Sequence, residues 1–257
     1  METIKVIHSG NAGDCIYALS SMHYLWTMQG KEIDLYLRVG VPSTFTSLTH
    51  PVGNVMLNDT MFEMLKPLLL SQSYIHDVIK VEASERVEVD YDFDLFRKES
   101  KNLSAGDIKL WYSLAYPELM PSTTYKVLDA SKYVGEEYIV INRSTRYNNP
   151  LIDYTLLEGL GKPIYFVGVE DEFKIMSAII PNLIHKEVSD FLEMADFINS
   201  SSLFVGNQSM AFSIAEQLKV PRILEQYAKA PNVIPQGGQW FTFHTNEQFK
   251  TILDKAL

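Results

Sequence analysis

Two polar loops hold the side chains of this sequence that are best suited to chemistry. The first, Ser9–Asp14, contains two glycines, Gly10 and Gly13, and ends in the carboxylate of Asp14. The second, Asn207–Ser209, comes directly before residues with helical spacing. A carboxylate can accept the proton of an attacking hydroxyl group, and a helix N-terminus offers unpaired backbone N–H groups to an anion. Together the loops predict a proton acceptor and an anion site.

Alternating strands and helices must position these loops. Strand patterns are expected at Ile4–His8, Ile33–Val39, Asp77–Ala83, Tyr138–Asn142, Ile164–Val169, Leu183–His185, Leu203–Val205 and Arg222–Leu224. Helical patterns are expected from Ile16 to near Gly30 and at Thr60–Ser73, Asp107–Tyr116, Tyr154–Leu160, Glu172–Ile180, Asp190–Asn199, Ser209–Leu218 and Thr245–Leu257. Phe45–Val52 fits neither pattern, and the acidic stretch Glu82–Asp94 is expected to be a solvated face that holds at most one strand.

The order of these elements predicts an α/β fold. Strands alternate with helices twice over, with a polar break at Lys126–Glu137, which indicates two Rossmann-like doubly wound parallel-sheet domains facing a cleft. We expect these domains at residues 1–130 and 131–257. In such folds ligands bind at the carboxyl ends of the strands, where both polar loops lie. The tail aromatics Trp240, Phe241 and Phe243 are expected to pack against the domains.

Composition narrows the class of partner. The net charge of −10 is spread over both halves, so an extended face for nucleic acid is disfavoured, although a local positive channel stays open. The single cysteine, Cys15, excludes an intrachain disulfide. The six histidines lack metal-ligand spacing, so no metal is expected. No apolar run is long enough for a transmembrane segment, and a cytoplasmic protein is expected.

Two stretches together resemble the ADP-heptose:lipopolysaccharide heptosyltransferases and their relatives in glycosyltransferase family 9. The first stretch is His8–Leu19, with a Gly-Asp pair before a helix that contains Ala-Leu. The second runs from Ala195-Asp196 through Leu203–Ser209 to Val220-Pro221. Tyr138–Asn142 and the arginines that follow it are similar to the strand and basic loop that begin that family's second domain.

The resemblance implies a GT-B-like fold and a glycosyltransferase. Such an enzyme moves a sugar from a nucleotide-sugar donor to a hydroxyl group of a glycan or other acceptor, without a metal and with inversion. The nucleotide sugar is then a substrate, and no cofactor is needed. The resemblance places the catalytic base at Asp14, which alternatively only caps the following helix. The departures at Gln208, Met210 and Ser213 imply that the donor need not be ADP-heptose.

The remaining candidates surround the expected donor. Donor phosphates are expected to contact Arg143, Arg146, Asn207, Gln208 and Ser209. Nucleoside or loop contacts are expected at Gly10, Gly13, Gly168 and Glu225. For the arginines the alternative is a solvated surface, and for the two glycines of the first loop a plain tight turn.

Three other functions are left open. The first is a GT-B-like module that binds nucleotides or sugars without turnover, and the second is a glycosyltransferase that acts on modified bases in DNA. The third is a nicotinamide-dependent enzyme, which the first loop disfavours because its glycines are spaced G-x-x-G rather than G-x-G-x-x-G.

Overall fold

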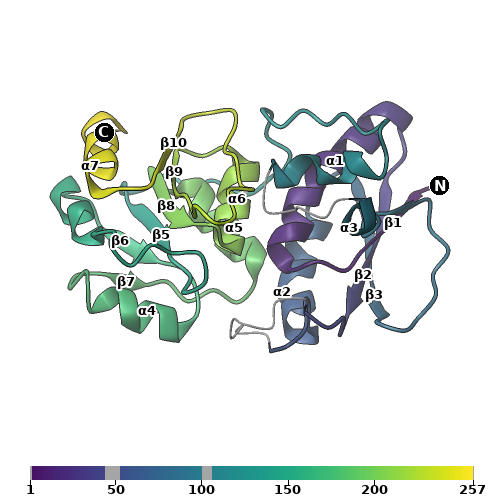
Figure 1. Cartoon of the computed structure of the whole chain (residues 1–257), viewed down its shortest axis with the longest axis horizontal. Coiled ribbons are helices and arrows are strands. Elements are labelled where there is room, and N and C mark those ends of the chain that lie inside the picture. Colours follow the sequence, from purple (N-terminus) through teal and green to yellow (C-terminus); the bar gives the residue numbers. More distant parts are fainter. Residues whose placement is uncertain (1, 44–52, 100–105, 257) are drawn as a thin grey trace.

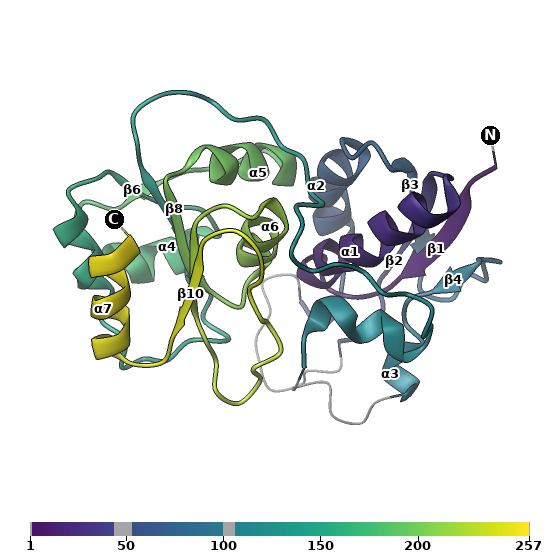
Figure 2. The same cartoon turned by 90° about the horizontal axis from the view of Figure 1, so that it is seen from above.

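The computed structural model describes residues 2–43, 53–99 and 106–256, so the run 45–52, for which the sequence predicts no element, lies outside the described residues. Two parallel β-sheets form two α/β halves that lie next to each other along the long axis of the molecule (Figure 1). The N-terminus lies at the far end of one half and the C-terminus at the far end of the other, and Figure 2 shows the same division from above.

The first half is built around a four-stranded sheet of order β3-β2-β1-β4. Its elements are β1 (Ile4–His8), α1 (Ala12–Gln29), β2 (Ile33–Val39), α2 (Asp59–Leu70), β3 (Ile75–Glu82), β4 (Tyr91–Asp92), α3 (Phe96–Glu99) and the 3-10 helix η1 (Ile108–Leu114). Alternate residues of β2 are buried, as expected for a strand whose one face meets the core. The carboxyl ends of β1 and β4 meet at one edge of this sheet.

The second half contains a six-stranded parallel sheet of order β10-β9-β8-β5-β6-β7. Its elements are β5 (Ile139–Asn142), the 3-10 helix η2 (Tyr154–Leu160), β6 (Ile164–Phe166), α4 (Glu170–Ser177), β7 (Ile184–His185), α5 (Phe191–Ser200), β8 (Leu203–Asn207), α6 (Met210–Leu218), β9 (Arg222–Glu225), β10 (Trp240–Phe243) and α7 (Asn246–Ala256). Every residue of β5 and β8 is buried, because helices cover both faces of the sheet. Strand order reverses between β5 and β8, which places the ligand crevice of such folds at their carboxyl ends.

Helices from both halves share one hydrophobic core. Helix α1 packs against α6, and α2 packs against α5. Met22 and Leu65 of the first half belong to the same buried cluster as Ile198 and Phe212 of the second. The approach of α1 to α6 is close at Gly13, where an added Cβ would lie 3.5 Å from the Met210 Cα. The halves are therefore held by packed apolar surface.

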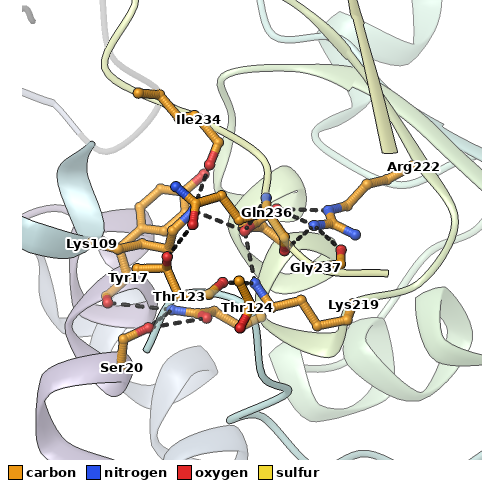
Figure 3. Close-up of polar contacts among 12 residues, drawn as sticks. Tyr17, Ser20, Lys109, Thr123, Thr124, Lys219, Arg222, Ile234, Gln236 and Gly237 are labelled. Carbon is orange, nitrogen blue, oxygen red and sulfur yellow. Dashed lines mark hydrogen bonds and ion pairs between the residues drawn. The ribbon is translucent and has the colours of Figure 1, made fainter. Parts of the chain in front are cut away.

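A buried network of charges also joins the halves (Figure 3). The carboxylate of Glu216, on α6, accepts hydrogen bonds from Lys109 Nζ at 2.8 Å, Lys219 Nζ at 2.8 Å and Arg222 Nε at 2.6 Å. Lys109 comes from η1 in the first half, and its Nζ also donates to the backbone carbonyl of Ile234. The side chains of Glu216, Lys109 and Arg222 are fully buried. We call these four charged residues the interdomain charge network.

The predicted α/β class with two Rossmann-like parallel sheets is confirmed. The helices expected at Asp107–Tyr116 and Tyr154–Leu160 are present as the 3-10 helices η1 and η2, and the acidic stretch holds one strand, the two-residue β4. The tail aromatics Phe241 and Phe243 pack against the buried core as expected, but the sequence did not predict that residues 240–243 form the edge strand β10. The boundary at 130/131 stays a prediction, although the described strands divide around it.

Candidate functional site

A cavity of about 660 Å³ opens between the two halves. It is lined by the N-terminal ends of α1 and α6 and by the segments that follow β5 and β6. Six of the sequence-predicted site residues line it, namely Gly13, Asp14, Arg146, Gly168, Gln208 and Ser209. The other four, Gly10, Arg143, Asn207 and Glu225, are not part of its lining. The volume is typical of a small-molecule site.

Asp14 lies in the first turn of α1, with its side chain 22% exposed. Its Oδ2 accepts a hydrogen bond from the backbone N–H of Asn11 at 3.2 Å, and Arg97 Nη2 lies 3.4 Å away. The carboxylate thus takes part in capping the helix and still reaches the cavity. The capping role and the predicted chemical role are compatible, because Asp14 Oδ1 makes no hydrogen bond within the described residues that would occupy it.

A buried histidine supports the backbone behind Asp14. Burial lowers the pKa of His8, with the nearby Asp94 and Asp14 carboxylates opposing, so the imidazole is neutral at pH 7. The N–H of Gly10 donates to His8 Nδ1 at 2.8 Å, which assigns the ring proton to Nε2, and Nε2–H then donates to Tyr112 Oη at 3.0 Å. The Tyr112 hydroxyl in turn donates to the Asp14 carbonyl at 3.1 Å.

Gly10 belongs to this support rather than to the cavity. A Cβ added there would lie 2.3 Å from His8 Cε1 and 2.8 Å from Asp14 Cβ. A side chain at this position would therefore displace both residues. The glycine is required for close packing within the loop, and its predicted contact with a ligand is not supported by this geometry.

Three residues that line the cavity, two of them at the carboxyl end of β5, carry buried polar atoms without partners in the described chain. Asn142 Nδ2 donates to the Val167 carbonyl at 2.6 Å, which fixes the amide and leaves Oδ1 without a hydrogen bond. Ser144 Oγ and the hydroxyl of Tyr17, which enters from α1, also lack partners within the described chain. An unpaired buried polar group costs about 1–3 kcal/mol. Three such atoms around one cavity favour a polar ligand with hydrogen-bonding groups of its own.

Asn207 holds the β5 segment in place. Its Oδ1 accepts from the Ser144 N–H at 3.0 Å, and its Nδ2 donates to the Ser144 carbonyl at 2.7 Å. The residue is fully buried. Both ends of its amide thus bind Ser144, and Asn207 positions that residue across the point where strand order reverses. Its contact with a donor phosphate stays a prediction.

Arg143 and Glu225 form a buried pair away from the cavity. Arg143 Nε lies 2.8 Å from Glu225 Oε2, its Nη2 lies 3.1 Å from Oε1, and the guanidinium stacks 4.5 Å above the ring of Tyr154. The side chains are 7% and 1% exposed. The predicted contacts of Arg143 with phosphate and of Glu225 with a nucleoside are not supported, because each residue neutralises the other inside the domain.

Arg146 behaves differently. It lines the cavity, lies 5.5 Å from the ring centroid of Tyr147, and is the only lysine or arginine among the described residues of the lining. Burial raises the pKa of the neighbouring Glu172, while the N–H of Thr145 and the charge of Arg146 lower it. Arg146 brings positive charge to the cavity and can therefore bind an anionic ligand, although the Glu172 carboxylate lies nearby.

The N-terminus of α6 forms the adjoining surface. Ser209 caps the helix, its Oγ accepting from the Phe212 N–H at 3.2 Å. Gln208 reaches the cavity, but its side chain is occupied. It donates to the Ala230 carbonyl at 2.8 Å and accepts from the Tyr227 N–H at 3.0 Å. The helix end itself, with its free N–H groups and dipole, is therefore the feature here that can bind an anion.

Sequence reasoning missed the unpaired cavity residues Tyr17, Asn142 and Ser144. A usable signal existed for Asn142, since it is the polar residue that ends a fully buried strand, whereas Tyr17 gave none. Among the described residues no group of three His, Cys, Asp or Glu side chains could hold a metal ion. Within the same part of the chain, no helix has both the length and the apolar character needed to cross a membrane.

Solved structures resemble this one over its whole length. The glycosyl transferase family 9 protein from Veillonella parvula superposes with a TM-score of 0.65 and 10% identity, covering 99% of this chain and 89% of that one. E. coli heptosyltransferase WaaC with ADP gives 0.67 and 12%, covering 100% of both. E. coli ADP-heptose lps heptosyltransferase II gives 0.68 and 12%, covering 99% and 98%. The expected resemblance is thus confirmed for the GT-B-like fold.

No family model matches the sequence, and no curated protein matches it significantly.

Proposed function

We propose that this chain is a metal-independent, inverting glycosyltransferase that moves a sugar from a nucleotide-sugar donor to an acceptor hydroxyl group. One observation carries the proposal: Asp14 from the first half and Arg146 with the α6 N-terminus from the second line the same cavity. A proton acceptor and an anion-binding surface thus line one space whose volume suits a small molecule. The likeness in fold to structures described as heptosyltransferases supports the same reaction class.

The reaction requires a proton acceptor and a site that stabilises the leaving diphosphate, and each half of the molecule supplies one of the two. The Asp14 carboxylate takes the proton of the acceptor hydroxyl while its oxygen forms a bond to the anomeric carbon. The bond from that carbon to the diphosphate oxygen breaks, and the nucleoside diphosphate leaves with the electron pair. Arg146, the N–H groups at the α6 N-terminus and the Ser144 hydroxyl stabilise the charge that develops on the diphosphate.

The unpaired atoms of the β5 segment indicate which groups of the donor each of them can bind. Asn142 Oδ1 can only accept hydrogen bonds, so it fits a hydroxyl or amine group of the donor rather than a phosphate. Ser144 Oγ can donate to a phosphate oxygen. The identity of the sugar and of the base is left out of the proposal, because Gln208 and Met210 differ from the residues of the resembling family.

Two coarser features complete the proposal. We place a domain boundary near residue 130, and we expect a cytoplasmic protein, in keeping with a sequence whose single cysteine permits no intrachain disulfide.

The test is a thermal-shift panel of nucleoside diphosphates and nucleotide sugars, followed by an assay for nucleoside diphosphate release. The proposal expects a rise in Tm with at least one nucleotide sugar and slow hydrolysis of that donor. Stabilisation without release across a panel of acceptors favours a binding module, and a preference for nicotinamide dinucleotides overturns the proposal.

A further inference from the structure

Methionines contribute five of the residues that line the cavity. They are Met56, Met61, Met64, Met194 and Met210, which we call the methionine wall. Half of the chain's ten methionines thus line one cavity. Methionine is flexible and polarizable, so it adapts to apolar groups of varied shape.

The wall spans both halves of the molecule. Met61 and Met64 lie on α2, while Met194 lies on α5, the helix against which α2 packs. Met194 and Met56 are each 4% exposed. Because Met61 and Met64 also contact the shared core, the wall is a fixed surface that continues the hydrophobic interior into the cavity.

Three of the five methionines lie on the acceptor side of the proposed reaction. Met56, Met61 and Met64 come from the same half as Asp14, and α1, which carries Asp14, contacts α2. An acceptor whose hydroxyl reaches Asp14 therefore presents the rest of its structure to the methionines. The diphosphate-binding features, Arg146 and the α6 N-terminus, come from the other half.

The charges of the cavity limit what else the acceptor can carry. Among its described lining residues are four carboxylates, Asp14, Glu170, Glu172 and Glu187, against Arg146 and a histidine that pairs with one of them. On the acceptor side the carboxylate is Asp14, and the described lining residues include no lysine or arginine besides Arg146. An acceptor that brought phosphate or carboxylate groups to Asp14 would therefore add like charge to it.

We propose that the acceptor is an uncharged hydroxyl compound whose aryl or alkyl group packs on the methionine wall. The inference deepens the proposed function and rests on it for the role of the bound compound. It excludes phosphorylated saccharides as the preferred acceptor class. The wall then acts as the specificity-determining surface for the acceptor.

The experiment uses probes that share a sugar and differ in their apolar group. Binding of methyl β-glucoside, octyl β-glucoside below its micelle concentration, 4-nitrophenyl β-glucoside and glucose 6-phosphate is measured by calorimetry on the full chain. We expect the octyl or nitrophenyl compound to bind at least tenfold more tightly than the methyl compound, and glucose 6-phosphate to bind more weakly than any of them.

Two variants locate the binding. Met61→Gln with Met64→Gln keeps side-chain length but adds polar groups to the wall, and should weaken octyl glucoside binding at least tenfold. Met28→Gln is the matched control, because Met28 is 65% exposed on α1 and away from the cavity, and should leave it unchanged. Equal affinity for methyl and octyl compounds, or octyl binding that survives the double substitution, overturns the inference.

Failure of the proposed function has a different signature. Nucleotide binding that depends on Arg146, without discrimination among the glucosides, leaves the glycosyltransferase proposal in place and removes the methionine-wall assignment. Octyl glucoside binding that requires the methionines, without any nucleotide binding, supports the apolar pocket and removes the glycosyltransferase.

Discussion

Two polar regions lie where the halves meet, and they differ in how their groups are satisfied. In the interdomain charge network, Glu216 is surrounded by the Lys109, Lys219 and Arg222 cations, and each charge is paired at 2.6–2.8 Å. Among the residues that line the cavity, Asn142 Oδ1, Ser144 Oγ and Tyr17 Oη are buried without partners in the described part of the chain. The first region is complete without any other molecule, and the second is not.

The difference distinguishes buried polar groups that stabilise the fold from buried polar groups that are available to a ligand. A buried charge is tolerated only when it is paired, so a closed network ties elements together and leaves nothing for a ligand. Unpaired atoms around a cavity lower the stability of the chain alone and regain their hydrogen bonds when a ligand binds. The same contrast appears three residues apart, between Arg143, which pairs with Glu225, and Arg146, which faces the cavity.

The largest expected effect comes from Asp14→Asn, on the cavity side of this comparison. Loss of the general base should reduce transfer by about 10²–10⁴-fold. Donor affinity should stay within about threefold and Tm nearly constant, because asparagine can still accept the cap hydrogen bond. Release of nucleoside diphosphate and donor calorimetry measure the two quantities, with Asp254→Asn on α7 as control. Full turnover would show that Asp14 is only a cap.

Glu216→Gln should break the network. The substitution keeps the shape of the side chain but removes the buried anion that three cations share, of which only Lys109 keeps another carboxylate of the described chain, Asp107, at 3.3 Å. This change costs about 3–5 kcal/mol of unfolding free energy. Urea unfolding measures it. Glu137→Gln is the control, since Glu137 is exposed and pairs only with Lys162, and it should cost less than about 1 kcal/mol. Equal losses would mean that the network contributes no more than a surface pair.

The two arginines sharpen the comparison within one loop. Arg146→Ala should weaken donor binding about 10-fold or more, since a hydrogen bond to a charged group contributes about 1.5–3 kcal/mol, and should barely change Tm. Arg143→Ala should lower Tm instead, because Glu225 is left buried and unpaired. Calorimetry and thermal unfolding of both variants separate the two roles. If Arg143→Ala weakened donor binding and Arg146→Ala lowered Tm, the roles of the two arginines would have to be exchanged.

The smallest effect is a pH dependence in the network. Burial lowers the pKa of Lys219 to about 8, with the Glu216 carboxylate opposing. Between pH 8 and the ordinary lysine pKa of about 10.4 the unfolded chain holds this proton more firmly than the folded chain, so Lys219 makes stability rise with pH, by at most about 1.4 kcal/mol per unit.

Lys219→Asn removes this contribution and suits the left-handed backbone at this position, where φ is 58°. The difference in unfolding free energy, wild type minus Lys219→Asn, should increase from pH 7.5 to 9.5, because only the wild type contains the Lys219 titration. The tyrosine titrations are common to both proteins and cancel in the difference. Lys255→Asn on α7 should show no such trend. A flat difference would mean that the folded and unfolded states bind the lysine proton equally.

Local patterns predicted the frame of the molecule because buried parallel strands are continuous apolar runs. The strands at Ile4–His8, Ile33–Val39 and Arg222–Glu225 begin where the sequence predicts. The edge strand β10 was missed because its Trp240 and Phe241 are partly exposed and follow a proline- and glycine-rich segment. The helices η1 and η2 are short, and their periodicity does not distinguish a 3-10 helix from an α-helix.

The sequence predicted only those features of the site that depend on residues close together in the chain. Asp14 and Arg146 stand in polar loops after predicted strands, and the structure brings both to the cavity. That Arg143 is neutralised depends on Glu225, 82 residues away. The methionine wall likewise forms only when α2 meets α5. Partners that are distant in sequence therefore decided which of the predicted residues are free to bind a ligand.

The interdomain charge network has a consequence for synthesis of the chain. Lys109 leaves the ribosome 107 residues before Glu216, which at 5–20 residues per second is a delay of roughly 5–20 s. During that interval Lys109 has Asp107 as its acidic partner but lacks Glu216, and the apolar face of α1 that α6 later covers is uncovered. Chaperone capture or aggregation of the growing chain is most favoured in this window, and it ends only when α6 has emerged.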